Sequence, residues 1–105
     1  IVHQFCHIGA HSFAAMGSAI GKDVPPYVLV SGNPARPHGI NVEGLRRRQF
    51  TAEQINCIKR AYKTLYQSGM LLSEAIAQIR ADAPERAEIE GFVQFLQGSE
   101  RRIVR

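Results

Sequence analysis

The stretch Val2–Pro25 divides into six-residue steps: V-H-Q-F-C-H from Val2, I-G-A-H-S-F from Ile8, A-A-M-G-S-A from Ala14 and I-G-K-D-V-P from Ile20. The first position of every step is aliphatic or small, and the fifth position is small. A helix would place apolar residues every three to four positions, and a simple strand every two. A strict period of six is instead typical of a parallel β-helix, in which each step forms one short face and its turn.

Residues 1–36 are therefore predicted to form β-helix coils. Four six-residue steps make little more than one three-sided coil, and a single coil cannot bury its own apolar lining. We therefore expect these residues to be the C-terminal end of a longer solenoid. Pro25 and Pro26 should interrupt the hydrogen-bonded pairing, and Tyr27–Val30 is one more short strand. Gly32–Ala35 is predicted to be a turn that takes the chain off the solenoid.

Residues 37–50 are predicted to be a linker, irregular over Pro37–Val42 and ending in a short basic helical turn over Glu43–Arg48. Residues 51–105 then follow as a helical domain. The fold class is thus β + α, the end of a parallel β-helix followed by a small three-helix domain.

The first of the three helices should begin at Thr51, whose spacing to Gln54 is that of a capping box, and stop at Gly69. The second is expected from Leu72 or Ser73 to Ala81. In the third helix, Pro84 should lie in the first turn with Asp82 as the N-cap, and the helix should stop at Gly98. The basic tail is expected to pack through Ile103 and Val104.

The length of 105 residues allows one domain, or a small domain plus an appendage, and the apolar fraction of 45% is enough for a packed core. No apolar run is long enough to cross a bilayer. Cys6 and Cys57 give no disulfide framework, so both are predicted to be reduced, in a cytoplasmic protein. His3, His7 and His11 are spaced by four, but in a six-residue repeat they take different positions, so no metal site is predicted.

The net charge of +4, with basic clusters at Arg46–Arg48 and Arg101–Arg102, favours an anionic partner. Nucleic acid is the weakest candidate for this partner. The basic residues are not interleaved with aromatic ones, and the sequence holds no nucleic-acid docking motif.

Three segments carry a resemblance to a known family: H-Q-F-C from His3, N-V-E-G-L-R-R-R from Asn41 and R-A-Y-K-x-x-Y from Arg60. With D-V-P-P-Y-V from Asp23 and G-N-P-A from Gly32, which many hexapeptide acyltransferases share, they make the whole chain resemble the C-terminal part of the UDP-N-acetylglucosamine O-acyltransferases. These enzymes carry out the first step of lipid A biosynthesis.

The resemblance implies a cytoplasmic homotrimer of left-handed parallel β-helices that needs no cofactor and no metal. Such an enzyme moves a 3-hydroxyacyl chain from acyl carrier protein to the 3-hydroxyl of UDP-N-acetylglucosamine. The family's general base is a histidine in an earlier coil, upstream of Ile1, and none of the four histidines here matches it. This chain alone is therefore expected to be inactive. The alternative is a non-catalytic module for oligomerisation or carrier-protein binding.

The resemblance also implies roles for individual residues. His3 and Gln4 would lie in the substrate cleft, or else hydrogen-bond within a trimer interface. Met16 would border the acyl pocket and shorten it, or else fill a gap in the core.

Three further roles belong to the linker and to the helix that follows it. Asn41 and Glu43 would contact the nucleotide, or else cap the short helix that follows. Arg47 and Arg48 would bind phosphates, or else be solvated. Lys59, Arg60 and Lys63, taken to lie on one side of the first helix, would dock the acyl carrier protein, or else form a solvated face.

Overall fold

Residues of the repeat pair in parallel, as the stacked coils of a β-helix require. The computed structural model describes residues 2, 7–15, 17–18, 20–99 and 103–104. Val2 pairs with Ile20, three six-residue steps further along, and Ile8 pairs with Val24. Strand β1 (Phe13–Ala14) continues this pattern with strand β2 (Val28–Ser31), with Phe13 opposite Leu29.

The two prolines interrupt the pairing between coils, as predicted. The Gly9 N–H donates to the Val24 carbonyl at 2.7 Å, and pairing resumes where the Tyr27 N–H donates to the Ala10 carbonyl at 2.9 Å. A Cβ atom on Gly9 would overlap the backbone of Pro25 and Pro26. The two chain segments can therefore come this close only with glycine at this position.

The prediction that Pro37–Val42 is irregular is wrong for most of these residues. Arg36–Ile40 forms strand β3, which pairs antiparallel with β2 and makes a three-stranded sheet in the order β1-β2-β3. Gly32–Ala35 is thus a hairpin turn that brings the chain back along β2. Pro37 is tolerated because β3 is an edge strand whose register with β2 is irregular near Val30. In turn, β3 supplies backbone hydrogen-bond partners to the edge of β2 that faces away from β1.

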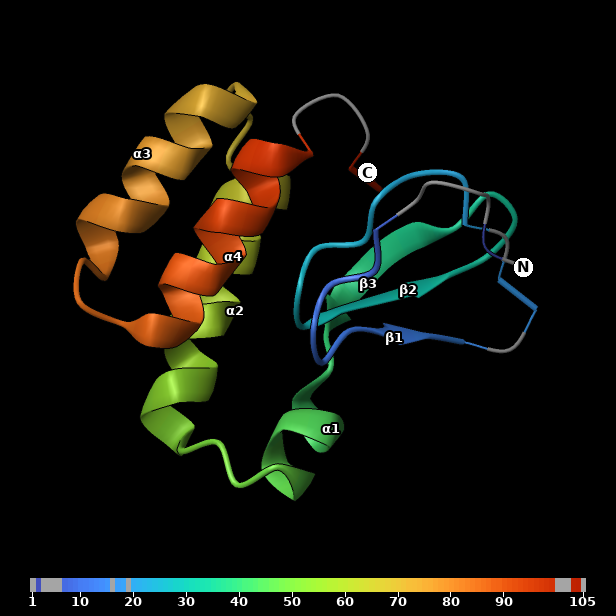
Figure 1. Ribbon diagram of the computed structural model, residues 1–105, viewed down its shortest axis with the longest axis horizontal. Helices are drawn as coiled ribbons and strands as arrows, with labels where there is room; N and C mark the ends of the chain where they lie inside the picture. Colours follow the sequence, from blue (N-terminus) through green and yellow to red (C-terminus); the bar gives the residue numbers. More distant parts are fainter. Residues whose placement is uncertain (1, 3–6, 16, 19, 100–102, 105) are drawn as a thin grey trace.

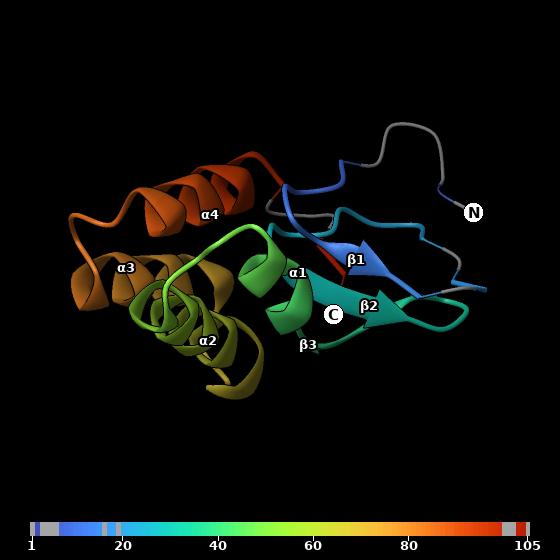
Figure 2. The ribbon, with the colours of Figure 1, turned by 90° about the horizontal axis from the view of Figure 1, so that it is seen from below.

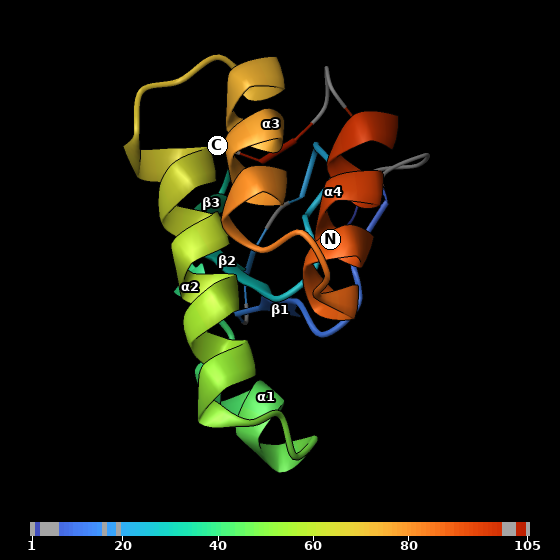
Figure 3. The same ribbon diagram turned by 90° about the vertical axis from the view of Figure 1, so that its left-hand side faces the viewer.

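In the part of the chain that the structure describes, four helices follow the sheet: α1 (Val42–Arg47), α2 (Ala52–Gln67), α3 (Leu72–Asp82) and α4 (Ala87–Gly98). Helix α1 is the predicted basic helical turn. The helices α2, α3 and α4 stand together beside the sheet, and α1 lies at one end of them (Figures 1 and 3). Helices α2, α3 and α4 lie in the region for which three helices were predicted, and the start of α4 differs from the prediction.

The predicted capping box of α2 is present, because Thr51 Oγ1 accepts from the Gln54 N–H and Gln54 Oε1 accepts from the Thr51 N–H. Gly69 follows the end of α2 with φ +75°, as a C-terminal glycine should. The predicted start of the last helix is wrong. Asp82 is the last residue of α3, where its side chain accepts from Gln78, and α4 begins only after Arg86.

A continuous apolar core joins the coil to the helices. Val24, Val28 and Val30 from the coil belong to the same buried cluster as Ile58 of α2 and Phe92 of α4. The C-terminal tail seals it, as predicted, since Ile103 and Val104 are both buried. The Val104 N–H donates to the carbonyl of Asp23, a fully buried residue whose Oδ1 accepts from the His7 N–H.

Candidate functional site

A cavity of about 410 Å³ lies where the sheet meets α1, and it has one apolar and one polar wall. Figure 2 shows α1 beside the sheet at this point. Phe13, Leu29 and Ile40 of the three strands line the apolar wall. The polar wall comes from α1 and its N-cap and is lined by Asn41, Glu43 and Arg47, together with Val42 and Gly44.

Three of the residues singled out in the sequence therefore meet in one cavity. Asn41 is also the N-cap of α1, because its Oδ1 accepts from the Gly44 N–H at 3.2 Å. Its Nδ2 donates to the His11 carbonyl at 3.1 Å, which ties the helix to the coil. The amide keeps one N–H and one oxygen lone pair for a ligand, so capping and ligand binding are compatible.

Glu43 and Arg47 form an ion pair one helical turn apart, with 2.8 Å between Glu43 Oε1 and Arg47 Nη2. Both side chains are more than three-quarters exposed. An exposed pair of this kind adds little to stability. Arg47 is therefore free to exchange the carboxylate for a phosphate at small cost.

The remaining predicted site residues lie elsewhere. Arg48 is the C-cap of α1 and is exposed, outside the lining of this cavity. Predictions for His3, Gln4 and Met16 fall outside the described residues.

Sequence reasoning missed Phe13 and Leu29 as part of the cavity. Phe13 is 52% exposed although it is aromatic. It takes the sixth position of its step, where the neighbouring steps have His7 and Ala19, and an aromatic at an outward position is the signal that could have found it.

A second cavity, of about 340 Å³, lies between β3 and α2 and has a basic lining. Its basic side chains are Lys59, Lys63 and His38, and the described lining includes no carboxylate. The prediction that Arg60 shares a side of the helix with these lysines is wrong. Arg60 is one residue further round α2 and faces α3 and the α3–α4 loop instead.

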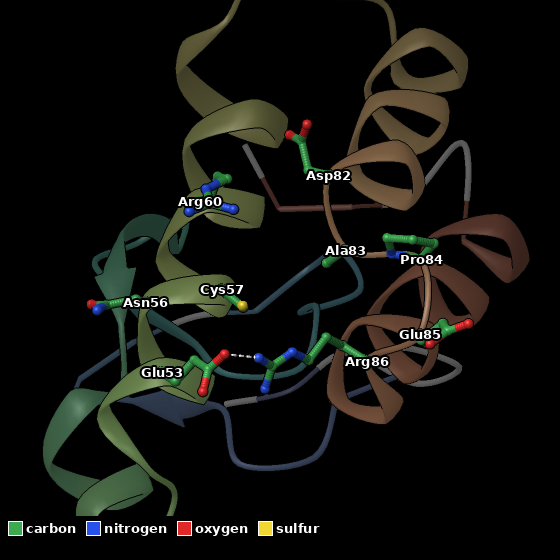
Figure 4. Close-up of a pocket in the computed structure, with 9 residues that line it drawn as sticks. All are labelled: Glu53, Asn56, Cys57, Arg60, Asp82, Ala83, Pro84, Glu85 and Arg86. Carbon is green, nitrogen blue, oxygen red and sulfur yellow. Dashed lines mark hydrogen bonds and ion pairs between the residues drawn. The ribbon is translucent and has the colours of Figure 1, made fainter.

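Arg60 lines an open cavity of about 890 Å³ between α2 and the α3–α4 loop (Figure 4). Glu53, Asp82 and Glu85 line this cavity together with Arg60 and Arg86, and Arg86 pairs with Glu53. Cys57 lies in the same lining as a free thiol. Charges of both signs offset one another here, so this cavity lacks the basic character of the one beside β3.

Burial raises the pKa of the Tyr27 phenol, and the neighbouring Glu88 carboxylate raises this pKa further. Tyr27 therefore stays neutral at physiological pH and donates a hydrogen bond to the Glu88 carbonyl at 3.0 Å. Burial also raises the pKa of Tyr62.

Within the described ranges, no cluster of three or more His, Cys, Asp or Glu side chains is placed to hold a metal ion. The same part of the chain has no helix whose length and apolar character would let it cross a membrane.

Residues 23–104 match the family described as Udp N-acetylglucosamine O-acyltransferase, domain 2. The chain belongs to this family. The matched region contains β2, β3 and all four helices, and therefore the polar wall of the sheet–α1 cavity.

Curated relatives agree with this assignment. The chain is 51% identical over its whole length to the acyl-[acyl-carrier-protein]–UDP-N-acetylglucosamine O-acyltransferase of Pseudomonas syringae pv. syringae, and covers 41% of that protein. It is 49% identical over 104 residues to the enzyme of the same name from Thiobacillus denitrificans, of which it covers 40%. The chain thus spans about two-fifths of the length of these relatives, and it matches their C-terminal portion.

Solved structures of the family share the fold. A UDP-N-acetylglucosamine acyltransferase from Bacteroides fragilis superposes with a TM-score of 0.94 at 42% identity, over 99% of this chain and 41% of that one. The Arabidopsis enzyme superposes with a TM-score of 0.88 at 32% identity, over 98% of this chain and 39% of that one.

Proposed function

We propose that this chain is the C-terminal part of an enzyme that transfers a 3-hydroxyacyl chain from acyl carrier protein to the 3-hydroxyl of UDP-N-acetylglucosamine, the first step of lipid A biosynthesis. The relatives' names give the acyl carrier protein and the nucleotide sugar. The observation that carries the proposal to this chain is the cavity in which Asn41, Glu43 and Arg47 meet beside an apolar wall.

The polar wall of the cavity suits the charged and polar groups of such a substrate, and the apolar wall suits its less polar groups. The Arg47 guanidinium can give up its exposed pairing with Glu43 and bind a phosphate through two parallel N–H donors, and Arg48 adds a second positive charge nearby. Asn41 and Glu43 can hydrogen-bond the uracil edge or the ribose hydroxyls. Phe13 and Leu29 offer an apolar face to the base or to the acyl chain. His3 and Gln4 would complete the cleft from the coil.

The reaction needs a base, because a sugar hydroxyl is a weak nucleophile at neutral pH. A histidine accepts the hydroxyl proton while the oxygen attacks the thioester carbonyl carbon, and the carbon–sulfur bond then breaks to release the carrier's thiolate. We propose that this base lies upstream of Ile1 in the full enzyme. Among the described residues, no histidine lines the sheet–α1 cavity: His7 is exposed, His11 packs against aromatic rings and His38 lies beside the lysines of α2.

The same proposal covers the assembly and its partner. The coils would belong to a left-handed β-helix that forms a cytoplasmic homotrimer. The acyl carrier protein is acidic, and the lysines of the cavity beside β3 give it a basic surface to dock on.

An acyl-transfer assay on the full natural protein tests the proposal. The donor is a 3-hydroxyacyl carrier protein, the acceptor is UDP-N-acetylglucosamine, and mass spectrometry detects the acylated product. N-acetylglucosamine 1-phosphate, which lacks the uridine, is the matched control acceptor. We expect acylation of the nucleotide sugar and little of the control. If no product forms while the protein still binds acyl carrier protein, the chain belongs to a non-catalytic carrier-binding module instead. The 105 residues alone should be inactive in the same assay.

A further inference from the structure

Helix α1 carries the polar wall of the candidate site but cannot hold its own position. It has six residues, of which Leu45 is the buried one. A helix this short is unstable in isolation, so tertiary contacts must fix both its form and its place. The contacts at its two ends therefore decide where Glu43 and Arg47 point.

Both ends of α1 are held by one residue of the coil, His11. At the N-terminal end, the His11 carbonyl accepts the hydrogen bond from Asn41 Nδ2 at 3.1 Å. At the C-terminal end, the His11 ring meets the ring of Phe50 edge-on, with centroids 5.2 Å apart and planes at 72°. Phe50 follows α1 closely, and its N–H donates back to the Leu45 carbonyl at 3.0 Å.

The backbone of His11 is what aims its carbonyl at Asn41. His11 has a left-handed φ of +58°, which histidine adopts more readily than β-branched residues do. Its ring lies parallel to the Tyr27 ring, with centroids 5.9 Å apart. Tyr27 is itself left-handed, with φ +71°, and its carbonyl accepts the Asn41 N–H at 2.6 Å. The stack on Tyr27 thus supports the strained turn that presents both carbonyls.

We propose that His11 is a positioning residue for the nucleotide sugar, acting through Asn41 and Phe50 on the placement of α1. The inference rests on the proposed function for the identity of the ligand. It does not require His11 to touch that ligand. The side chain acts by keeping the left-handed turn and by packing on Phe50, and the backbone carbonyl acts on Asn41.

The test uses three variants of the full natural protein. His11→Val disfavours the left-handed backbone and removes the ring. His11→Asn also removes the ring but tolerates the left-handed backbone. Phe92→Leu is the control, because Phe92 stacks on the other side of the aromatic cluster, with its ring 6.3 Å from that of Tyr27, and lies on α4.

Hydrogen exchange is the first measurement, and it is independent of the ligand. In His11→Val, the amides of Gly44, Leu45 and Arg48 should exchange about tenfold faster relative to those of α2, given the cost of the left-handed backbone for a β-branched residue. His11→Asn should give a smaller increase. Unchanged exchange rates in α1 would overturn the proposal. Equal increases of these rates in the two variants would show that the left-handed backbone of His11 does not contribute to the placement of α1.

Steady-state kinetics is the second measurement. In His11→Val, the KM for UDP-N-acetylglucosamine should rise about tenfold while kcat stays within about twofold, because positioning α1 affects binding rather than the chemical step. Phe92→Leu should lower the melting temperature and leave this KM unchanged. If α1 loosens in His11→Val but the KM does not rise, His11 does not position the site. A wild-type protein that fails to use the nucleotide sugar would refute the proposed function, and hydrogen exchange would still decide whether His11 places α1.

Discussion

The Tyr27 hydroxyl donates a 3.0 Å hydrogen bond to the Glu88 carbonyl and so joins the coil to α4 across 61 positions of sequence. Replacing Tyr27 with Phe removes this part-buried hydrogen bond, and we expect a loss of about 1 kcal/mol in the free energy of unfolding at pH 7. Urea unfolding of the purified protein measures it. An unchanged free energy would show that the contact between the coil and α4 does not depend on this bond.

Alkaline pH should weaken the same contact. Burial raises the pKa of Tyr27 in the folded protein, and an unfolded tyrosine ionises near pH ~10. The neutral phenol therefore contributes its full stabilisation below about pH 10, and this is lost as the pH rises through the folded value. Tyr27→Phe should flatten the fall in stability above pH 10. Tyr62→Phe, at a residue whose pKa is also raised by burial, is the matched control and should flatten that fall without a similar loss at pH 7.

Gly44 should be irreplaceable in α1, although glycine disfavours helices. A Cβ atom at Gly44 would overlap the side-chain amide of Asn41, which caps the helix through the Gly44 N–H. Gly44→Ala should therefore displace Asn41 and weaken binding of UDP-N-acetylglucosamine by about tenfold or more, the cost of a lost cap.

Gly91→Ala is the matched control, since a Cβ atom at Gly91 on α4 meets no atom within 4 Å. It should stabilise the protein by about 0.5–1 kcal/mol and leave binding unchanged. Calorimetry of both variants measures their thermal stability and their binding of UDP-N-acetylglucosamine. Equal binding by the two would mean that the Asn41 side chain takes no part in the site.

Charge reversal at Lys59 and Lys63 should raise the KM for the acyl carrier protein. The two lysines line the basic cavity beside β3, and their replacement by Glu would repel an acidic partner. We expect an increase of at least about tenfold that shrinks at high salt. Arg60→Glu is the control, because Arg60 faces the mixed-charge cavity on another side of α2. A larger increase of this KM in Arg60→Glu would show that the carrier protein docks at the mixed-charge cavity instead.

Met16→Gly tests the predicted acyl pocket. A methionine that shortens the pocket should make the enzyme prefer a shorter 3-hydroxyacyl chain, so the glycine variant should accept longer donors with higher kcat/KM. The measurement is a competition between carrier-protein donors of different chain length. Unchanged selectivity would mean that Met16 only fills the core.

The six-residue period and the helix patterns could be predicted from the sequence because each follows from local spacing. Thr51 with Gln54, and Gly69, mark the two ends of α2 by chemistry that needs no distant partner. The packing of the tail was predictable from Ile103 and Val104, whose apolar character favours burial.

Strand β3 could not be predicted in this way, because Pro37 and Gly39 have low strand propensity. The free edge of β2 imposes the strand on them, and that edge exists only in the folded sheet. The misplaced start of α4 has a similar cause: Asp82 and Pro84 form a plausible start signal, but α3 continues through Asp82.

Only the polar wall of the candidate site could be predicted from the sequence. Asn41, Glu43 and Arg47 stand close together in the chain, and the family resemblance drew attention to them. Phe13 and His11 come from a coil about thirty positions earlier in the chain. Only the fold brings Phe13 into the cavity wall and His11 against both ends of α1.

The most direct test of the account compares two neighbouring arginines of α1 in the full natural protein. Arg47 lines the sheet–α1 cavity, whereas Arg46, in the same last turn, is exposed and outside its lining. Isothermal titration with UDP-N-acetylglucosamine should show a Kd about ten- to a hundredfold higher for Arg47→Ala, the cost of losing charge-assisted hydrogen bonds to a phosphate, and a nearly unchanged Kd for Arg46→Ala. Equal Kd values for the two variants would contradict the assignment of this cavity to the nucleotide sugar.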